Sequence, residues 1–172
     1  MSKFIMAGSY PVSFKNKSVC DIGSGCGISS IASVMMGASR VVANDIDPYA
    51  GAALEMNLSL NNIPTDKVDI LIENKIPTNR EEVALAKLFF SQFDIIICGD
   101  MLYDTMLSAS LLLALDEHPC VLLGDPGRHG CPRDILDSDD KALGERLLAS
   151  YPHMEDGFSS VKVFRLNAPS GC

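Results

Sequence analysis

The 172-residue sequence contains no tryptophan, and its six cysteines form no C-x-x-C pair. Such spacing is typical of neither a zinc site nor a redox centre, so we expect free thiols in a reducing compartment. No apolar run approaches the roughly 20 residues that span a bilayer, and the amino-terminus shows no secretory signal pattern. His118, His129 and His153 lack metal-ligand spacing. We therefore expect no metal site and no membrane partner.

Basic residues are also scarce. The chain has 14 Lys and Arg against 22 Asp and Glu, a formal net charge of -8, and the basic residues are scattered. Binding to a nucleic-acid backbone requires basic side chains concentrated on one face, which argues against nucleic acid as a partner. An acidic surface suits a cationic partner such as a lysine-bearing protein. The length predicts one domain over 18–172, and the lack of periodicity over 1–17 predicts an irregular lead-in. We expect a monomer.

Hydrophobic periodicity alternates between strand and helix along the chain. Strands are predicted at 18–22, 40–43, 68–72, 93–98 and 120–123, and helices at 27–36, 48–60, 79–90, 105–115 and 141–150. Turns or loops are predicted at 124–127 and 128–140, and Asp156-Gly157 predicts a hairpin between 151–155 and 158–166. This alternation predicts an α/β fold: a mostly parallel sheet with helices on both faces, the apolar 93–98 at its centre and an antiparallel hairpin at its C-terminal edge.

A glycine-rich loop, residues 20–27 (CDIGSGCG), joins the first predicted strand to the first helix. Glycine tolerates positive φ and close approach of the backbone to a ligand, so the loop predicts a nucleotide-like cofactor. A dinucleotide fingerprint would require glycine or alanine at Ile28. The D-x-G-x-G-x-G pattern instead resembles the first motif of the Rossmann-like seven-strand S-adenosylmethionine methyltransferases. The cofactor contacts implied by this resemblance come from Asp21, Gly23, Ser24, Gly25 and Gly27.

The second predicted strand runs into residues 44–48 (NDIDP). A carboxylate at this point can accept hydrogen bonds from both ribose hydroxyls, which assigns Asp45 to the cofactor with Asn44 and Ile46 beside it. Asp47, directly before a proline, is better explained as a helix N-cap. A cap or turn is also the alternative role for Asp45.

Polar residues follow the third and fourth predicted strands as well. Asn74 lies where such folds hold the adenine amine, with a solvated turn as the alternative. Asp100 and Tyr103 follow the fourth strand, at the edge of an open parallel sheet where catalytic groups lie. Their D-M-L-Y segment resembles the Asp-x-x-Tyr pattern of seven-strand protein lysine methyltransferases. The resemblance implies that Asp100 orients a lysine cation and that Tyr103 lines its channel, whereas an N-cap and a packing ring are the alternatives.

Within that group the chain is most similar to the electron-transfer-flavoprotein β-subunit lysine methyltransferase family. The segments that carry the resemblance are 21–27, 37–40, 43–48, 99–104 and 123–128. It implies trimethylation of lysines on that flavoprotein subunit, a protein substrate, in the mitochondrial matrix, with the cytoplasm as the alternative. The Asp-Ile-Asp-Pro element also occurs in ribosomal protein L11 methyltransferases, which keeps another protein substrate open.

The chain differs from this family in its amino-terminal region. Family members carry a longer N-terminal region with a Trp-Pro-Gly-Gly type segment that helps to cover the cofactor. This chain has no tryptophan and only seventeen residues before the first predicted strand. A catalytically impaired S-adenosylmethionine-binding module that lacks its lid is therefore the alternative to an active enzyme.

Overall fold

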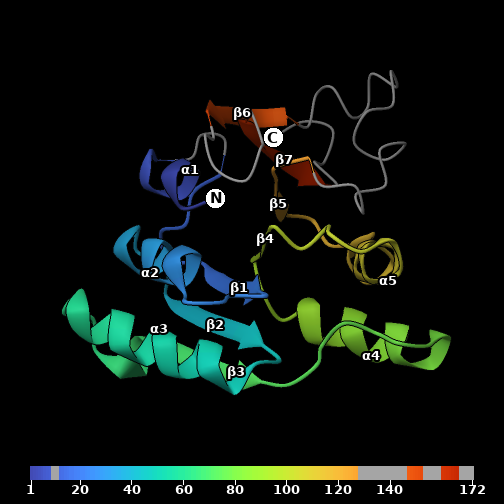
Figure 1. Cartoon of the computed structure of the whole chain (residues 1–172), viewed down its shortest axis with the longest axis horizontal. Helices are drawn as coiled ribbons and strands as arrows, with labels where there is room; N and C mark the ends of the chain where they lie inside the picture. Colours follow the sequence, from blue (N-terminus) through green and yellow to red (C-terminus); the bar gives the residue numbers. More distant parts are fainter. Residues whose placement is uncertain (9–11, 128–146, 153–159, 167–172) are drawn as a thin grey trace.

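The computed structural model describes residues 1–8, 12–127, 147–152 and 160–166, and these form one seven-stranded sheet in the order β3-β2-β1-β4-β5-β7-β6 (Figure 1). The strands are β1 (Ser18–Ile22), β2 (Arg40–Asp45), β3 (Val68–Ile72), β4 (Ile95–Gly99), β5 (Val121–Asp125), β6 (Leu147–Pro152) and β7 (Ser160–Leu166). β1 to β5 pair in parallel, and β7 is antiparallel to both β5 and β6. The predicted mostly parallel sheet with an antiparallel C-terminal edge is confirmed.

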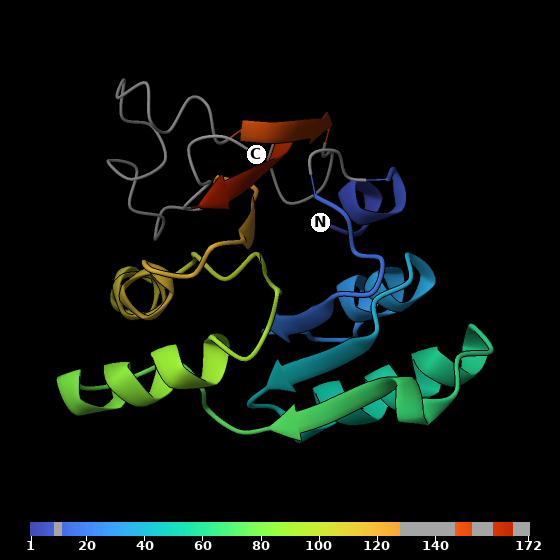
Figure 2. The same cartoon turned by 180° about the vertical axis from the view of Figure 1, so that it is seen from behind.

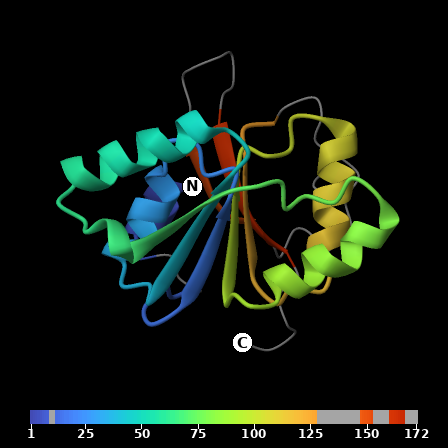
Figure 3. The ribbon, with the colours of Figure 1, turned by 90° about the horizontal axis from the view of Figure 1, so that it is seen from below.

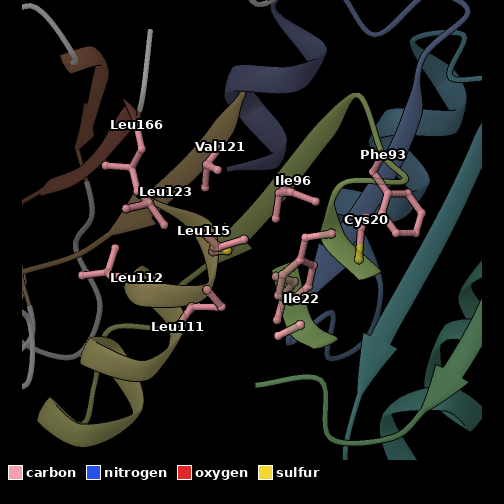
Figure 4. Close-up of a cluster of buried hydrophobic side chains, with 14 of the residues drawn as sticks. Cys20, Ile22, Phe93, Ile96, Leu111, Leu112, Leu115, Val121, Leu123 and Leu166 are labelled. Atoms are coloured by element: carbon pink, nitrogen blue, oxygen red, sulfur yellow. The ribbon is translucent and has the colours of Figure 1, made fainter. Parts of the chain in front are cut away.

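Helices cover both faces of the sheet (Figures 1 and 2). They are α1 (Ser2–Met6), α2 (Ile28–Met35), α3 (Pro48–Leu60), α4 (Arg80–Phe90) and α5 (Thr105–Leu115), with a 3-10 turn at Thr65–Lys67. α1, α2 and α3 bury apolar side chains against one face, and α4 and α5 against the other. Figure 4 shows part of the second core, where Leu111 and Leu115 of α5 face Ile96 of β4.

The order of the strands reverses at β1, which pairs with β2 on one side and with β4 on the other. In open parallel sheets this switch point leaves a crevice outside the carboxyl ends of the strands, where ligands bind. The segment between β3 and α4 crosses this edge from one helical layer to the other (Figure 3). The fold therefore brings the loops after β1, β2, β3 and β4 to one place.

Three predictions about elements are corrected by tertiary contacts. Residues 1–17, predicted to be irregular, contain α1, and Met1 packs beside Gly99 and Gly124 near the carboxyl ends of β4 and β5. The helix predicted at 141–150 is wrong for Leu147 onward, because these residues pair with β7 as the edge strand β6. β5 continues through the predicted turn at Gly124 and Asp125, because β7 pairs with both residues.

Some predicted features lie outside the described residues, namely the loop at 128–140, the first part of the helix at 141–150 and the turn at Asp156-Gly157. Within the described ranges, no helix combines the length and apolarity required to cross a membrane. The same residues contain no group of three or more His, Cys, Asp or Glu side chains that could hold a metal ion.

Candidate active site

The loop after β1 reaches α2 through three glycines with positive φ, Gly23 at 64°, Gly25 at 52° and Gly27 at 80°. At Gly23 a Cβ atom would lie 2.0 Å from Sδ of Met101, and at Gly27 it would lie 2.1 Å from Cδ1 of Leu54. A side chain at either position would add a steric clash to the strain of the left-handed backbone. Glycine therefore lets this loop pack directly against the β4–α5 segment on one side and α3 on the other.

Asp45 ties this loop to the end of β2. Its Oδ2 accepts the backbone N–H of Gly25 at 2.9 Å, and its Oδ1 accepts the N–H of Asp47 at 3.0 Å. Asp47, not Asp45, caps α3, because its Oδ1 accepts the N–H of Tyr49 at 2.9 Å. Asp45 is therefore a half-buried carboxylate held in one orientation from two sides.

The two predicted asparagines also brace the backbone around this edge. Asn44 is buried, and its Nδ2 donates to the carbonyls of Leu71 and Glu73 at 2.9 and 2.8 Å. These bonds hold the end of β3 against β2. Oδ1 of Asn74 accepts the N–H of Ile76 at 3.0 Å in an exposed turn. The solvated turn that was the alternative for Asn74 is therefore present, although the residue also lines the pocket described below.

Asp21 lies buried beneath the glycine loop. The side chain is 2% exposed, and Ser30 Oγ of α2 donates to its Oδ2 at 2.7 Å. Burial raises the pKa of Asp21 to about 6, while hydrogen bonds from the Ser30 hydroxyl and backbone N–H lower it and the charge of Asp45 raises it further. Asp21 therefore supports the first turn of α2 from inside the protein and is not among the residues that line the pocket.

The raised pKa of Asp21 predicts a pH dependence of stability. The carboxyl pKa is about 6 in the folded chain and about 3.9 in an unfolded one, so the folded state binds more protons between these values. The contribution of Asp21 to the free energy of unfolding is therefore fully present below about pH 4. About 3 kcal/mol of it is lost as the pH rises through 6. Relative to the unmodified chain, Asp21→Asn should therefore gain about 3 kcal/mol between about pH 4 and 7, measured by urea unfolding.

Asp94→Asn provides a control of opposite sign. Hydrogen bonds from the Ser18 backbone and hydroxyl lower the pKa of Asp94, so its contribution is present at neutral pH and is lost as the pH falls. This variant should lose stability relative to the unmodified chain as the pH rises. Parallel stability curves for Asp21→Asn and the unmodified chain would exclude a raised pKa at Asp21.

A pocket of about 180 Å³ opens where these loops meet. Its lining residues are Ile22, Gly23, Asn44, Asp45, Ile46, Asn74, Lys75, Ile76, Met101, Tyr103 and Leu107. An adjoining pocket of about 220 Å³ shares Asn74, Lys75 and Ile76 with it. The structure thus brings together six predicted residues from the end of β2 and the four loops after β1 to β4, whereas Asp21, Ser24, Gly25, Gly27 and Asp100 are not among the lining residues.

The pocket walls also contain residues that sequence reasoning missed. Met101 comes from the segment that joins β4 to α5, Leu107 from the first turn of α5, and Ile76 from the crossing after β3. The available signal for Met101 was its place directly after Asp100, inside the D-M-L-Y segment. Leu107 gave no such signal, because α5 is apolar on most of its surface.

The structure excludes the N-cap alternative for Asp100 and places Tyr103 at the pocket. The N-cap of α5 is Asp104, whose Oδ1 accepts the N–H of Leu107 at 2.9 Å, so Asp100 does not cap this helix. Asp100 instead adopts a left-handed backbone, with φ of 59°, and its N–H donates to the carbonyl of Gly124 at 2.7 Å. Tyr103 is 56% exposed at the pocket, which does not fit a buried packing ring.

The described histidine and cysteines take structural positions. Nε2 of His118 lies 3.0 Å from the carbonyl of Phe93, and its Nδ1 accepts the N–H of Cys120 at 3.2 Å. A pocket of about 430 Å³ beside His118, between α4 and α5, lies at the amino ends of β4 and β5, away from the motifs. Cys20, Cys98 and Cys120 are free and buried, and burial raises the pKa of each thiol.

The family model for ribosomal protein L11 methyltransferase (PrmA) matches residues 11–107. This range includes the glycine loop, Asp45 and the segment from Asp100 to Tyr103. The chain belongs to the PrmA methyltransferase family. The seven-strand S-adenosylmethionine methyltransferase fold expected from the glycine motif is thereby confirmed.

Relatives of this PrmA-family chain include the mouse electron transfer flavoprotein beta subunit lysine methyltransferase, which is 42% identical over 69% of this chain and 44% of the relative. The homologue of that protein from Caenorhabditis elegans is 33% identical over 96% of this chain and 73% of the relative. The chain thus spans less than half the length of the mouse relative.

Magnesium protoporphyrin IX methyltransferase (ChlM) from Synechocystis PCC 6803, solved with bound SAM, has a similar structure. The TM-score is 0.65 at 17% identity, and the match covers 95% of this chain and 74% of that one. At this identity the similarity concerns the fold.

Proposed function

We propose that this chain is the catalytic domain of an S-adenosylmethionine-dependent protein-lysine N-methyltransferase that acts on the electron transfer flavoprotein β subunit. The observation that carries the proposal is the pocket at the β1–β4 switch point, with Asp45 on one wall and Tyr103 on another. The names of the mouse and Caenorhabditis elegans relatives support this substrate. The description of the family model supports a ribosomal protein L11-like substrate as the second candidate.

The residues around the pocket fit S-adenosylmethionine, which carries ribose hydroxyls and no phosphate. Each carboxylate oxygen of Asp45 accepts one backbone N–H and keeps a further lone pair for a ribose hydroxyl. Ile46, Ile76 and Leu107 line the same pocket and would offer apolar contacts to the adenine ring. When bound, the cofactor supplies an electrophilic methyl group carried by a sulfonium.

On the acceptor side, the chain must hold a lysine amine and allow it to lose a proton. A free lysine has a pKa of about 10.4 and arrives protonated. A carboxylate raises the pKa of a neighbouring amine, so Asp100 captures and orients the cation but is a poor choice for a strong base. The proton leaves to water, and Tyr103 forms a wall of the lysine channel at the pocket. Positioning of the two reactants accounts for most of the rate.

Calorimetry with S-adenosylmethionine and mass spectrometry of the flavoprotein β subunit after incubation test this proposal. The unmodified chain should bind the cofactor and add methyl groups to lysine. Asp45→Ala should weaken cofactor binding by about 10- to 100-fold, because hydrogen bonds to a charged group contribute about 1.5–3 kcal/mol. Glu55→Ala, which removes an exposed carboxylate from α3, is the matched control and should bind normally.

The outcomes separate the candidates. Binding without methylation of any protein would favour the cofactor-binding module. Methylation of ribosomal protein L11 but not of the flavoprotein subunit would favour the second substrate. Equal cofactor affinity in Asp45→Ala and the unmodified chain would contradict the assigned site. The mitochondrial matrix stays a prediction, which imaging of the tagged chain in cells would test.

A further inference from the structure

Four large apolar side chains are exposed where α3 and α5 begin: Ile46, Tyr49, Tyr103 and Met106, which we call the apolar rim. Their exposed fractions lie between 56% and 82%. The rim contains two of the four tyrosines of the chain. Large apolar residues that are exposed beside a pocket and bordered by polar ones are typical of a protein interaction site.

The rim comes from two loops that meet at the pocket. Ile46 lies between β2 and α3 and Tyr49 lies in the first turn of α3, whereas Tyr103 lies just before α5 and Met106 lies in its first turn. Ile46 and Tyr103 both line the pocket, which places one half of the rim on each side of it. Figure 3 shows α3 and α5 beginning at the same edge of the sheet. Two of the four rim residues therefore belong to the walls of the proposed catalytic pocket.

The charged residues interspersed with the rim are acidic. Asp47 and Asp104 cap α3 and α5, and each is held by a hydrogen bond from the first turn of its helix. Asp100 is exposed at the end of β4. Among the described residues that line the pocket, Lys75 is the basic one, and it forms an ion pair with Glu73. A partner with both apolar and positively charged groups complements this surface.

We propose that the apolar rim docks a loop of the protein substrate in which an apolar side chain lies close to the target lysine, an inference that rests on the proposed function. Tyrosine and methionine suit this role, because tyrosine is common among the residues that dominate interfaces and methionine adapts to irregular surfaces. The rim thus selects the protein, while Asp45 and the glycine loop hold the cofactor. Acidic residues around the rim attract the lysine-bearing segment during encounter.

The double variant Tyr49→Ser with Met106→Gln tests the rim without changing residues assigned to the catalytic or cofactor site. Its Kd and KM for the electron transfer flavoprotein β subunit should rise about tenfold or more, with cofactor affinity and kcat unchanged. The matched control is Met56→Gln with Leu60→Gln, two α3 residues that are 68% and 77% exposed. They lie about 10 Å or more from Tyr49 along the helix and should leave all constants unchanged.

The binding measurements test the docking proposal, and the methylation measurements test the proposed activity. Unchanged binding in the rim variant, an equal loss in the control, or no binding of the flavoprotein subunit by the unmodified chain would overturn docking. A change in sedimentation without a change in substrate Kd would identify the rim as a contact between copies of the chain and would also overturn it. Rim-dependent binding without methylation would support docking and count against the proposed activity.

Discussion

Replacing Gly23 with alanine should abolish S-adenosylmethionine binding, measured by calorimetry, and should be the most damaging single substitution in the loop. The left-handed backbone at Gly23, with φ of 64°, costs an L-residue about 1–2 kcal/mol. The new Cβ atom would also lie 2.0 Å from Sδ of Met101. Met101 lines the pocket, so its displaced side chain would enter the space that the cofactor requires.

Gly8→Ala is the control that separates the effect of backbone strain on stability from the effect of a displaced Met101 on cofactor binding. Gly8 also has a positive φ, 84°, but a Cβ atom there would meet nothing within 4 Å. Both variants should lower the Tm, by about 2–4 °C for each kcal/mol lost, yet only Gly23→Ala should lose cofactor binding. Cofactor affinity of Gly23→Ala within about threefold of the unmodified chain would refute the role assigned to the Met101 contact.

Asp100→Asn is expected to lower methylation by about 10- to 100-fold, because it removes a charged partner of the substrate cation while keeping the shape of the side chain. Asparagine tolerates the left-handed backbone that Asp100 adopts, so the Tm should change little. Cofactor affinity should also stay the same, since Asp100 is not among the residues that line the pocket. Methylation of the flavoprotein subunit and calorimetry with the cofactor provide the two measurements.

Two further substitutions at this position distinguish strain from catalysis. The free energy of unfolding of Asp100→Gly should exceed that of Asp100→Ala by about 1 kcal/mol, because glycine adopts φ near 59° without strain. Both should be as inactive as Asp100→Asn or more so. Activity in any of the three that equals that of the unmodified chain would remove Asp100 from the proposed site.

Most elements of the fold could be predicted because their signals are local. The apolar run at Ser18–Ile22 and the Asp47-Pro48 start of α3 depend on neighbouring residues, and both are confirmed. Local sequence patterns gave wrong predictions where pairing with a distant strand determines the secondary structure. Leu147–Pro152 has residues compatible with a helix, yet pairing with β7 makes it a strand. The length of β5 likewise depends on β7.

For the candidate site, the sequence by itself determined which loops carry polar and glycine residues and, through the parallel order of strands, that these loops share one edge. Only the tertiary structure decided what each side chain does there. Asp21 turned inward to Ser30, Asp45 bridged two loops and Met101 packed on Gly23. The contacts of Asp21 with Ser30, of Asp45 with Gly25 and of Met101 with Gly23 join residues 9 to 78 positions apart. Motifs specify local backbone and chemistry, whereas burial and hydrogen-bond partners are properties of the packed whole.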